Sequence, residues 1–313
     1  MKTKTKIFLS MMLSLIFVLA ACSNDSSSNE KKAGDGPLKV ISSFTIIQNM
    51  LEEIGDDHVE VHNLVPSGTD PHEYEPKPDD IKAVTDADVL FYNGLNLEGG
   101  DAGWLSKLTN SVGMEEDQMI EVAKEVEPMY LKDEKGQQET NPHAFINPKV
   151  GIIMAESIRD NLVKIDPDNE ADYKKNADEY IGKLKEIEQR YKEEFGAIPD
   201  DNRILVAGEY AFQYMTAEYD IKEGYIWAID TDDNGTPEQI KEAVKFVKEN
   251  KPKYLFVESN VDRRPMETVS KETGVPIFEE VIYADEIGNK GDPVDTYIKF
   301  LETNLENMTS GMK

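Results

Sequence analysis

Residues 166–199 read DPDNEADYKKNADEYIGKLKEIEQRYKEEFGAIP, and this stretch decides how the rest of the chain is organised. Its apolar side chains recur every three or four positions, which is the period of one helical face. Asp166 offers an N-cap and Pro167 suits a first helical turn, while Pro199 predicts the C-terminal end of the helix. We predict one helix of about 30 residues, roughly 45 Å long. Its apolar positions are Tyr173, Ala177, Tyr180, Ile181, Leu184, Ile187, Tyr191, Phe195 and Ile198.

A helix of this length has two interpretations. It could lie on the surface of a single domain, or it could be a rigid connection between two lobes. The second interpretation is favoured because apolar strand-like runs alternate with amphipathic helical runs on both sides of it. Such alternation is typical of βαβ units with parallel sheets.

We therefore predict an α/β fold of two lobes, each a parallel sheet flanked by helices, joined by one long rigid helix. The ligand site is expected in the cleft between the lobes. The polar stretch Glu125–Thr140 has no clear period and is predicted to be a loop. The predicted strands are Leu38–Ser42, Val59–Val65, Val89–Tyr92 and Met119–Val122 in the first lobe, and Arg203–Ala207, Tyr225–Ile229, Tyr254–Val257 and Val275–Phe278 in the second.

The first residues have the features of a secretory signal. Lysines at positions 2, 4 and 6 precede the apolar run Ile7–Leu19, which is too short for a comfortable membrane span. Cys22, the sole cysteine, follows Leu19-Ala20-Ala21, where a lipoprotein signal peptidase would cut and a lipid would be attached. An ordinary signal followed by a chance cysteine is the alternative. We predict a lipoprotein signal peptide at residues 1–21 and lipidation of Cys22.

Residues 22–36 are polar apart from Cys22 and Ala33, so they cannot bury a core and are predicted to be a flexible tether. The folded part would then be anchored to the outer face of the bacterial cell membrane, with the lipid as its only membrane contact. The domain boundaries follow as an N-terminal lobe at 37–165, a linking helix at 166–199 and a C-terminal lobe at 200–313.

The net charge of the chain restricts the classes of partner that it can bind. Asp and Glu number 62 against 34 Lys and Arg, for a formal net charge of −28. This balance argues against binding of nucleic acid or of an anionic surface. It is compatible with a cationic ligand, although a solvated acidic surface gives the same number.

Four polar residues stand where a parallel fold places its ligands. His72, Glu209 and Asp285 each follow a predicted strand, and His143 lies in the last loop of the first lobe. Two imidazoles and two carboxylates suit a divalent cation, because the carboxylates cancel its charge. Each could also be an ordinary loop residue, and Glu209 could interact with the dipole of the helix that follows it. Spacing alone leaves these alternatives open.

The sequences around these residues resemble one family. They are Asp70–Pro76, Pro142–Pro148, Glu209–Tyr214, Val257–Pro265 and Ala284–Gly288. All are similar to motifs of the metal-binding lipoproteins, also called adhesin-like lipoproteins, that serve ABC importers of manganese, zinc or iron. The resemblance implies metal-binding lobes and ligands at the positions of His72, His143, Glu209 and Asp285.

The resemblance also bears on the metal. Zinc-type members usually have histidine at the position of Glu209 and often carry a histidine-rich loop, whereas residues 115–140 contain no histidine. The chain thus resembles the manganese-type branch, which implies Mn²⁺ as cargo. Zn²⁺ and Fe²⁺ are the alternatives, since sites containing nitrogen generally bind Zn²⁺ more tightly than Mn²⁺. The resemblance also implies a small residue at position 210, where this chain has Tyr210.

The implied function is capture of the metal and its delivery to an ABC permease driven by a cytoplasmic ATPase. We expect the protein to be a monomer. We also expect that it is not an enzyme, because four protein ligands leave little room for a reacting water and no further acid or base motif is present. A metalloenzyme and a surface adhesin are the alternatives from other classes. Glu258 is expected to form an ion pair or a cap rather than to bind metal.

Overall fold

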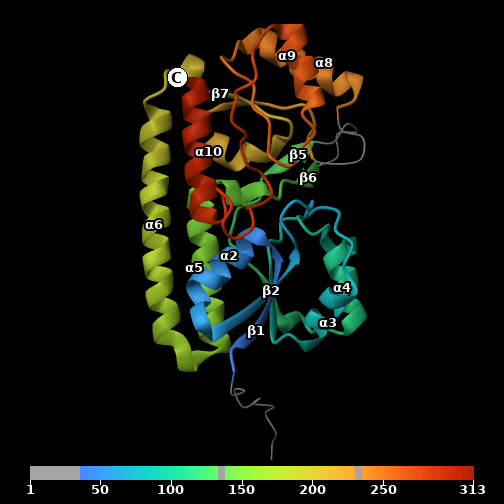
Figure 1. The fold of residues 1–313 in the computed structure, drawn as a ribbon, viewed down its shortest axis with the longest axis vertical. Helices are drawn as coiled ribbons and strands as arrows, with labels where there is room; N and C mark the ends of the chain where they lie inside the picture. Colours follow the sequence, from blue (N-terminus) through green and yellow to red (C-terminus); the bar gives the residue numbers. More distant parts are fainter. Residues whose placement is uncertain (1–35, 133–137, 230–234) are drawn as a thin grey trace, which may run out of the picture. The chain divides into compact units, whose positions relative to one another are not determined.

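The computed structural model describes residues 36–132, 138–229 and 235–313 (Figure 1). The predicted signal segment, Cys22 and the tether up to residue 35 lie outside these residues. Among the helices that the structure describes, none combines the length and apolar character needed to cross a membrane.

The N-terminal lobe is built on a parallel sheet with the strand order β2-β1-β3-β4. Figure 1 shows α2 and α5 on one side of this sheet and α3 and α4 on the other. All four strands predicted for this lobe are present. The central strands β1 and β3 are largely buried, whereas the edge strands β2 and β4 are mostly intermediate in burial. The bounds are β1 Leu38–Phe44, α2 Thr45–Gly55, β2 Val59–Val65, α3 Pro78–Asp86, β3 Val89–Tyr92, α4 Trp104–Val112, β4 Met119–Glu121 and α5 Pro148–Ile165.

The predicted long helix is α6, Glu170–Gly196, whose 27 residues span about 40 Å. The predicted N-cap at Asp166 is wrong. Residues Pro167–Asn169 form a separate 3₁₀ turn, and the Asp166 carboxylate instead accepts hydrogen bonds from Tyr173 Oη and Asn169 Nδ2, both 2.7 Å long. The carboxylate thus ties this turn to the first turn of α6.

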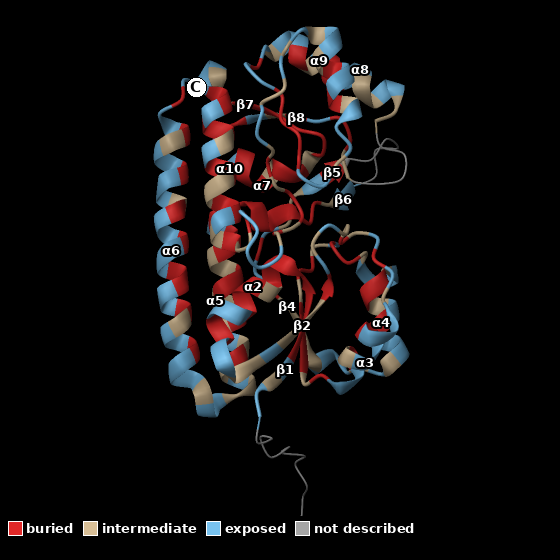
Figure 2. Ribbon diagram, in the orientation of Figure 1, coloured by how far each residue is buried: buried red, intermediate tan, exposed pale blue. Residues whose placement is uncertain are grey.

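Helix α6 contacts both lobes. One face is buried along its whole length and the other is exposed (Figure 2). Asn176 Nδ2 donates to Ile54 O at the end of α2, 3.2 Å away, and Tyr191 Oη donates to Leu301 O of α10 (Tyr297–Met312) at 2.7 Å. The prediction of two α/β lobes joined by one long helix is confirmed, and side chains of both lobes share one hydrophobic core along this helix.

The C-terminal lobe has a less regular parallel sheet. Strand β7 (Ile204–Val206) pairs with β8 (Lys222–Gly224), and parallel bridges join Leu255 to Ile277 and Glu258 to Ile282. The strands predicted at 254–257 and 275–278 are reduced to the bridge from Leu255 to Ile277, because Pro276 has no N–H for a continuous ladder. The helices of this lobe are α7 Gln213–Glu218, α8 Pro237–Asn250, α9 Arg264–Thr273 and α10.

Two sequence predictions are wrong in detail. The strand expected at Tyr225–Ile229 lies earlier, at β8. The N–H groups of Ile226 and Trp227 both donate to Gly208 O, so the chain turns there. The loop expected at Glu125–Thr140 contains an antiparallel pair, β5 (Tyr130–Lys132) with β6 (Gln138–Thr140). Such short strands give no periodic signal.

Candidate metal centre

All four predicted site residues meet between the lobes. One donor atom from each of His72, His143, Glu209 and Asp285 lies within 4.8 Å of all the others. His143 Nε2 is 3.2 Å from His72 Nε2, 3.1 Å from Asp285 Oδ1 and 3.7 Å from Glu209 Oε1. His72 Nε2 lies 3.9 Å from Asp285 Oδ1. Three of the side chains are fully or almost fully buried, and that of His72 is 7% exposed.

These separations fit the coordination shell of a small cation. An ion about 2.1 Å from four tetrahedral donors separates the donors by about 3.4 Å, close to the four distances observed. Two carboxylates neutralise a divalent charge, and two neutral imidazoles add lone pairs without adding charge. The donor set therefore suits a divalent transition metal better than an alkali cation or an anion.

The His72 loop is held by neighbours on its own lobe. Asp70 Oδ1 accepts the backbone N–H of His72 at 2.7 Å, and Trp104 Nε1 donates to Pro71 O at 2.9 Å. Tyr74 packs edge-on against the Trp104 ring, with the centroids 5.2 Å apart, and donates its hydroxyl to Asp80 Oδ2 on α3. The loop that follows β2 is thus fixed on both sides of the imidazole.

His143 begins the short 3₁₀ helix η4 (His143–Ile146), directly before α5. Its ring Nδ1 lies 2.8 Å from Asn141 Oδ1, so the nitrogen facing the cluster is Nε2. Asn147 caps α5 by accepting the N–H of Lys149, with Pro148 in the first turn. The cap fixes where α5 starts and hence where η4 presents His143.

Glu209 lies three residues after the end of β7 and directly precedes the 3₁₀ turn η7 (Tyr210–Phe212). Its side chain makes no capping hydrogen bond to that turn. Glu258 holds the backbone ahead of this turn rather than forming the expected ion pair or helix cap. Its carboxylate accepts the N–H groups of Gly208 at 3.0 Å and of Glu209 at 2.8 Å, which fixes the backbone at the candidate ligand.

Asp285 is oriented by an amide of its own lobe. Asn260 Nδ2 donates to Asp285 Oδ2 at 2.8 Å, which leaves Oδ1 directed at the histidines. Burial raises the pKa of the Asp285 carboxyl. The hydrogen bond from His143 and the charges of His143 and His72 lower this pKa by more, so that it falls below its usual range. Burial and the nearby His143 lower the pKa of His72 to about 4. At neutral pH the site therefore holds an ionised Asp285 and a neutral His72, the forms that bind cations.

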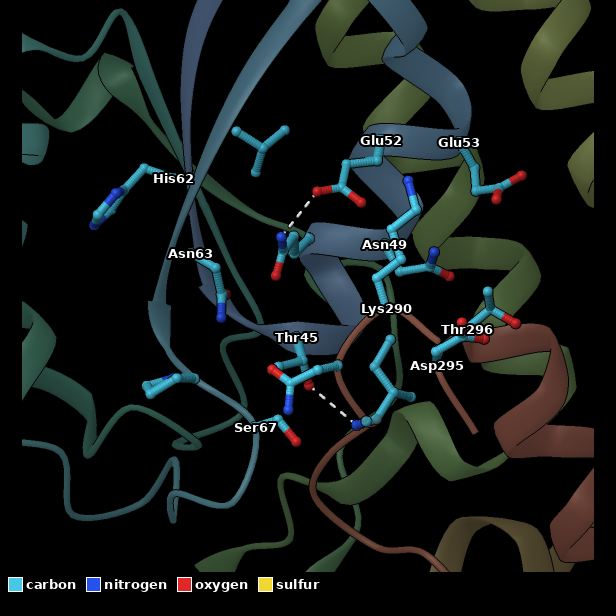
Figure 3. Close-up of a pocket in the computed structure, with 16 residues that line it drawn as sticks. Thr45, Asn49, Glu52, Glu53, His62, Asn63, Ser67, Lys290, Asp295 and Thr296 are labelled. Carbon is cyan, nitrogen blue, oxygen red and sulfur yellow. Dashed lines mark hydrogen bonds between the residues drawn. The ribbon is translucent and has the colours of Figure 1, made fainter. Parts of the chain in front are cut away.

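A separate cavity has a volume of about 700 Å³, and Figure 3 shows its polar lining. It runs between α2 with β2 on the N-terminal lobe and residues 287–296 on the C-terminal lobe, and none of the four clustered side chains lines it. At its edge the N–H of Ile287 donates to Thr45 Oγ1 at 3.1 Å, and the Glu286 carboxylate accepts the N–H of Gly68. The segment after Asp285 is thus bonded to the opposite lobe.

The residues that orient the candidate ligands were missed at the level of sequence, although one signal was present. Both histidines end the same pattern, Asp70-Pro71-His72 and Asn141-Pro142-His143. An Asp or Asn side chain commonly accepts the N–H two residues on, and both do so here, at 2.7 and 3.0 Å. No comparable local signal indicates Asn260, which lies 25 positions from its partner.

Two α/β lobes joined by a long helix, with a candidate metal centre between them, define the class of two-lobed substrate-binding proteins. Residues 40–311 match the family described as zinc-uptake complex component A, periplasmic, and the chain belongs to this family of metal-binding proteins of ABC transporters. The family inferred from the motifs is thereby confirmed.

Individual relatives agree with this assignment. The metal ABC transporter substrate-binding lipoprotein SsaB of Streptococcus sanguinis is 39% identical over 306 residues, which cover 97% of this chain and 98% of that protein. The iron ABC transporter substrate-binding lipoprotein MtsA of Streptococcus pyogenes serotype M1 is 40% identical over 298 residues, 95% of each chain.

Solved structures share the fold. A Mn-bound periplasmic metal-binding protein from Candidatus Liberibacter asiaticus superposes with a TM-score of 0.78 at 26% identity, covering 88% of this chain and 99% of that one. The periplasmic zinc-binding protein TroA of Treponema pallidum has a TM-score of 0.79 at 20% identity over the same shares, which supports the fold alone.

Proposed function

We propose that this protein captures a divalent transition metal outside the cell and delivers it to an ABC permease driven by a cytoplasmic ATPase. The observation that carries the proposal is the buried cluster of His72, His143, Glu209 and Asp285, with two side chains from each lobe. The relatives are transport proteins by name, and the match extends along nearly the whole chain.

We propose Mn²⁺ as the cargo. Two carboxylates give the site more hard oxygen donors than a site rich in histidine has, and a relative of known structure is Mn-bound. Zn²⁺ and Fe²⁺ are the alternative cargoes. The family description refers to zinc, MtsA is named for iron, and imidazole nitrogens favour Zn²⁺ in the usual order of affinities.

The proposed location is the outer face of the cell membrane, through a lipid on Cys22 and a tether at 22–36. Support comes from the signal-like residues 1–21 and from relatives named as lipoproteins. In this proposal the lobes at 37–165 and 200–313, joined through 166–199, act together as a monomer around a single ion.

Uptake by cells tests this function. In a strain of the host bacterium that lacks the gene, the wild-type chain should restore uptake of radiolabelled manganese under metal limitation. A double variant, His72→Ala with His143→Ala, should remain at the level of the empty vector. His58→Ala is the matched control, because His58 pairs with Asp172 on α6 and takes no part in the cluster. Restoration of zinc or iron uptake alone would overturn manganese as the cargo, and full activity of the double variant would overturn the site.

A further inference from the structure

The side chain of Asn141 lies between the two halves of the candidate site. It is fully buried although it is a neutral amide with two donor hydrogens and an acceptor oxygen. On one side Oδ1 faces His143, 3.0 Å from its backbone nitrogen and 2.8 Å from ring Nδ1. On the other side Nδ2 faces the C-terminal lobe, 2.9 Å from Tyr210 O and 3.1 Å from Gln213 Oε1.

These partners fix the orientation of the amide. The backbone N–H of His143 can only donate, so the atom that faces it is the oxygen. The carbonyl of Tyr210 can only accept, so the atom that faces it is the nitrogen. Since Oδ1 also lies against His143 Nδ1, that ring nitrogen carries the hydrogen. When this imidazole is neutral, its lone pair is therefore on Nε2, the nitrogen that faces His72, Asp285 and Glu209.

The same residue holds the loop that presents Glu209. Tyr210 directly follows Glu209, and its carbonyl is one of the two acceptors for the Asn141 amide. The backbone of Asn141 adds a further bond between the lobes, because Tyr214 Oη on α7 donates to Asn141 O at 2.8 Å. The N–H of Met129 in turn donates to this Tyr214 hydroxyl at 2.8 Å. One buried amide therefore contacts a candidate ligand of the first lobe and the neighbour of a candidate ligand of the second.

We propose that Asn141 is a positioning residue that couples the two halves of the site. Its oxygen holds His143 in the tautomer that offers Nε2 to the metal, while its amide hydrogens hold the Glu209 loop against the same imidazole. The inference rests on the proposed function, since it assigns the affinity and release rate of the bound ion partly to Asn141. Separation of the lobes at this point would break the bonds to Tyr210 and Gln213 and loosen the support of both ligands together.

Two variants of Asn141 separate its two roles. Asn141→Ala removes both, and we expect Mn²⁺ to bind about 10–100-fold more weakly, the usual cost of losing a group that orients a ligand. Asn141→Asp keeps an oxygen for His143 but places a second oxygen against Tyr210 O. It should keep the His143 tautomer and release the ion about tenfold faster. Gln213→Ala removes two bonds between the lobes, one with Asn141 and one with Tyr130 O, and should accelerate release without changing His143.

The experiment combines Mn²⁺ titration, stopped-flow release into a chelator and ¹⁵N NMR of the histidine rings of the metal-free protein. Wild type should show a protonated Nδ1 in His143, and Asn141→Ala should lose this signature. Asn161→Ala is the control, because that amide donates to Ser157 O within α5.

If circular dichroism shows that Asn141→Ala does not fold, Asn141→Asp and Gln213→Ala provide the test instead. Failure of the wild type to bind Mn²⁺ would overturn the proposed function. Variants with wild-type affinity, release rate and His143 signals would overturn the role of Asn141 alone.

Discussion

Replacement of Asp285 by asparagine is expected to weaken Mn²⁺ binding at least about 100-fold, or about 2.8 kcal/mol. The substitution keeps the shape of the side chain and an oxygen donor but removes one of the two negative charges that balance the ion. Because the site is buried, water cannot supply the missing compensation, and a buried charge without its partner is costly. Calorimetric titration of the purified chain with Mn²⁺ measures the effect.

A matched control separates the site from the general charge of the chain. Asp262→Asn removes the same charge from the same lobe, at an exposed aspartate that pairs with Arg264. This control should bind Mn²⁺ within about twofold of wild type, because exposed charges are screened by solvent and salt. Equal affinities for Asp285→Asn and wild type would show that Asp285 does not bind the ion.

Replacement of Glu209 by histidine is expected to turn the preference of the site from manganese toward zinc. The variant shell would have three imidazoles and one carboxylate, so the ion would lose a hard oxygen donor and half of its charge compensation. Softer nitrogen donors strengthen the usual advantage of Zn²⁺ over Mn²⁺. We expect Mn²⁺ affinity to fall at least about 100-fold while Zn²⁺ affinity changes less than about tenfold. Competition titrations and metal analysis of protein from cells grown in balanced metals measure the change.

The control for this substitution is Glu272→His, an exposed position near the end of α9. It adds the same imidazole to the same lobe outside the cluster and should leave the ratio of bound manganese to zinc unchanged. If Glu209→His and wild type carry the two metals in the same ratio, the carboxylate at this position does not determine the preference.

The N-terminal sheet and α6 could be predicted from sequence because their signals are local. Short runs rich in apolar and β-branched residues define β1 to β3, and the helical period of α6 persists over 27 residues. The C-terminal sheet was less predictable, since Pro276 interrupts hydrogen bonding and the chain turns at Ile226. There the observed pairing depends on tertiary contacts rather than on local pattern.

The candidate site was predictable at the level of its four clustered residues. His72, Glu209 and Asp285 follow strands or strand-like segments, and ligands in parallel α/β folds gather at such loops. The groups that orient them depend on the folded backbone. Asn260 meets Asp285 only because two loops distant in sequence come together. The bonds from Asn141 to Tyr210 and Gln213 require the lobes to be in place. Sequence spacing carries no direct information on such contacts.

Anomalous diffraction from crystals of the chain grown with Mn²⁺, with data at the manganese absorption edge, would locate the bound ion. We expect one strong peak between the lobes, within about 2.5 Å of His72 Nε2, His143 Nε2, Asp285 Oδ1 and a Glu209 carboxylate oxygen. A peak at another position, such as the cavity between α2 and residues 287–296, with none among these four side chains, would contradict this expectation.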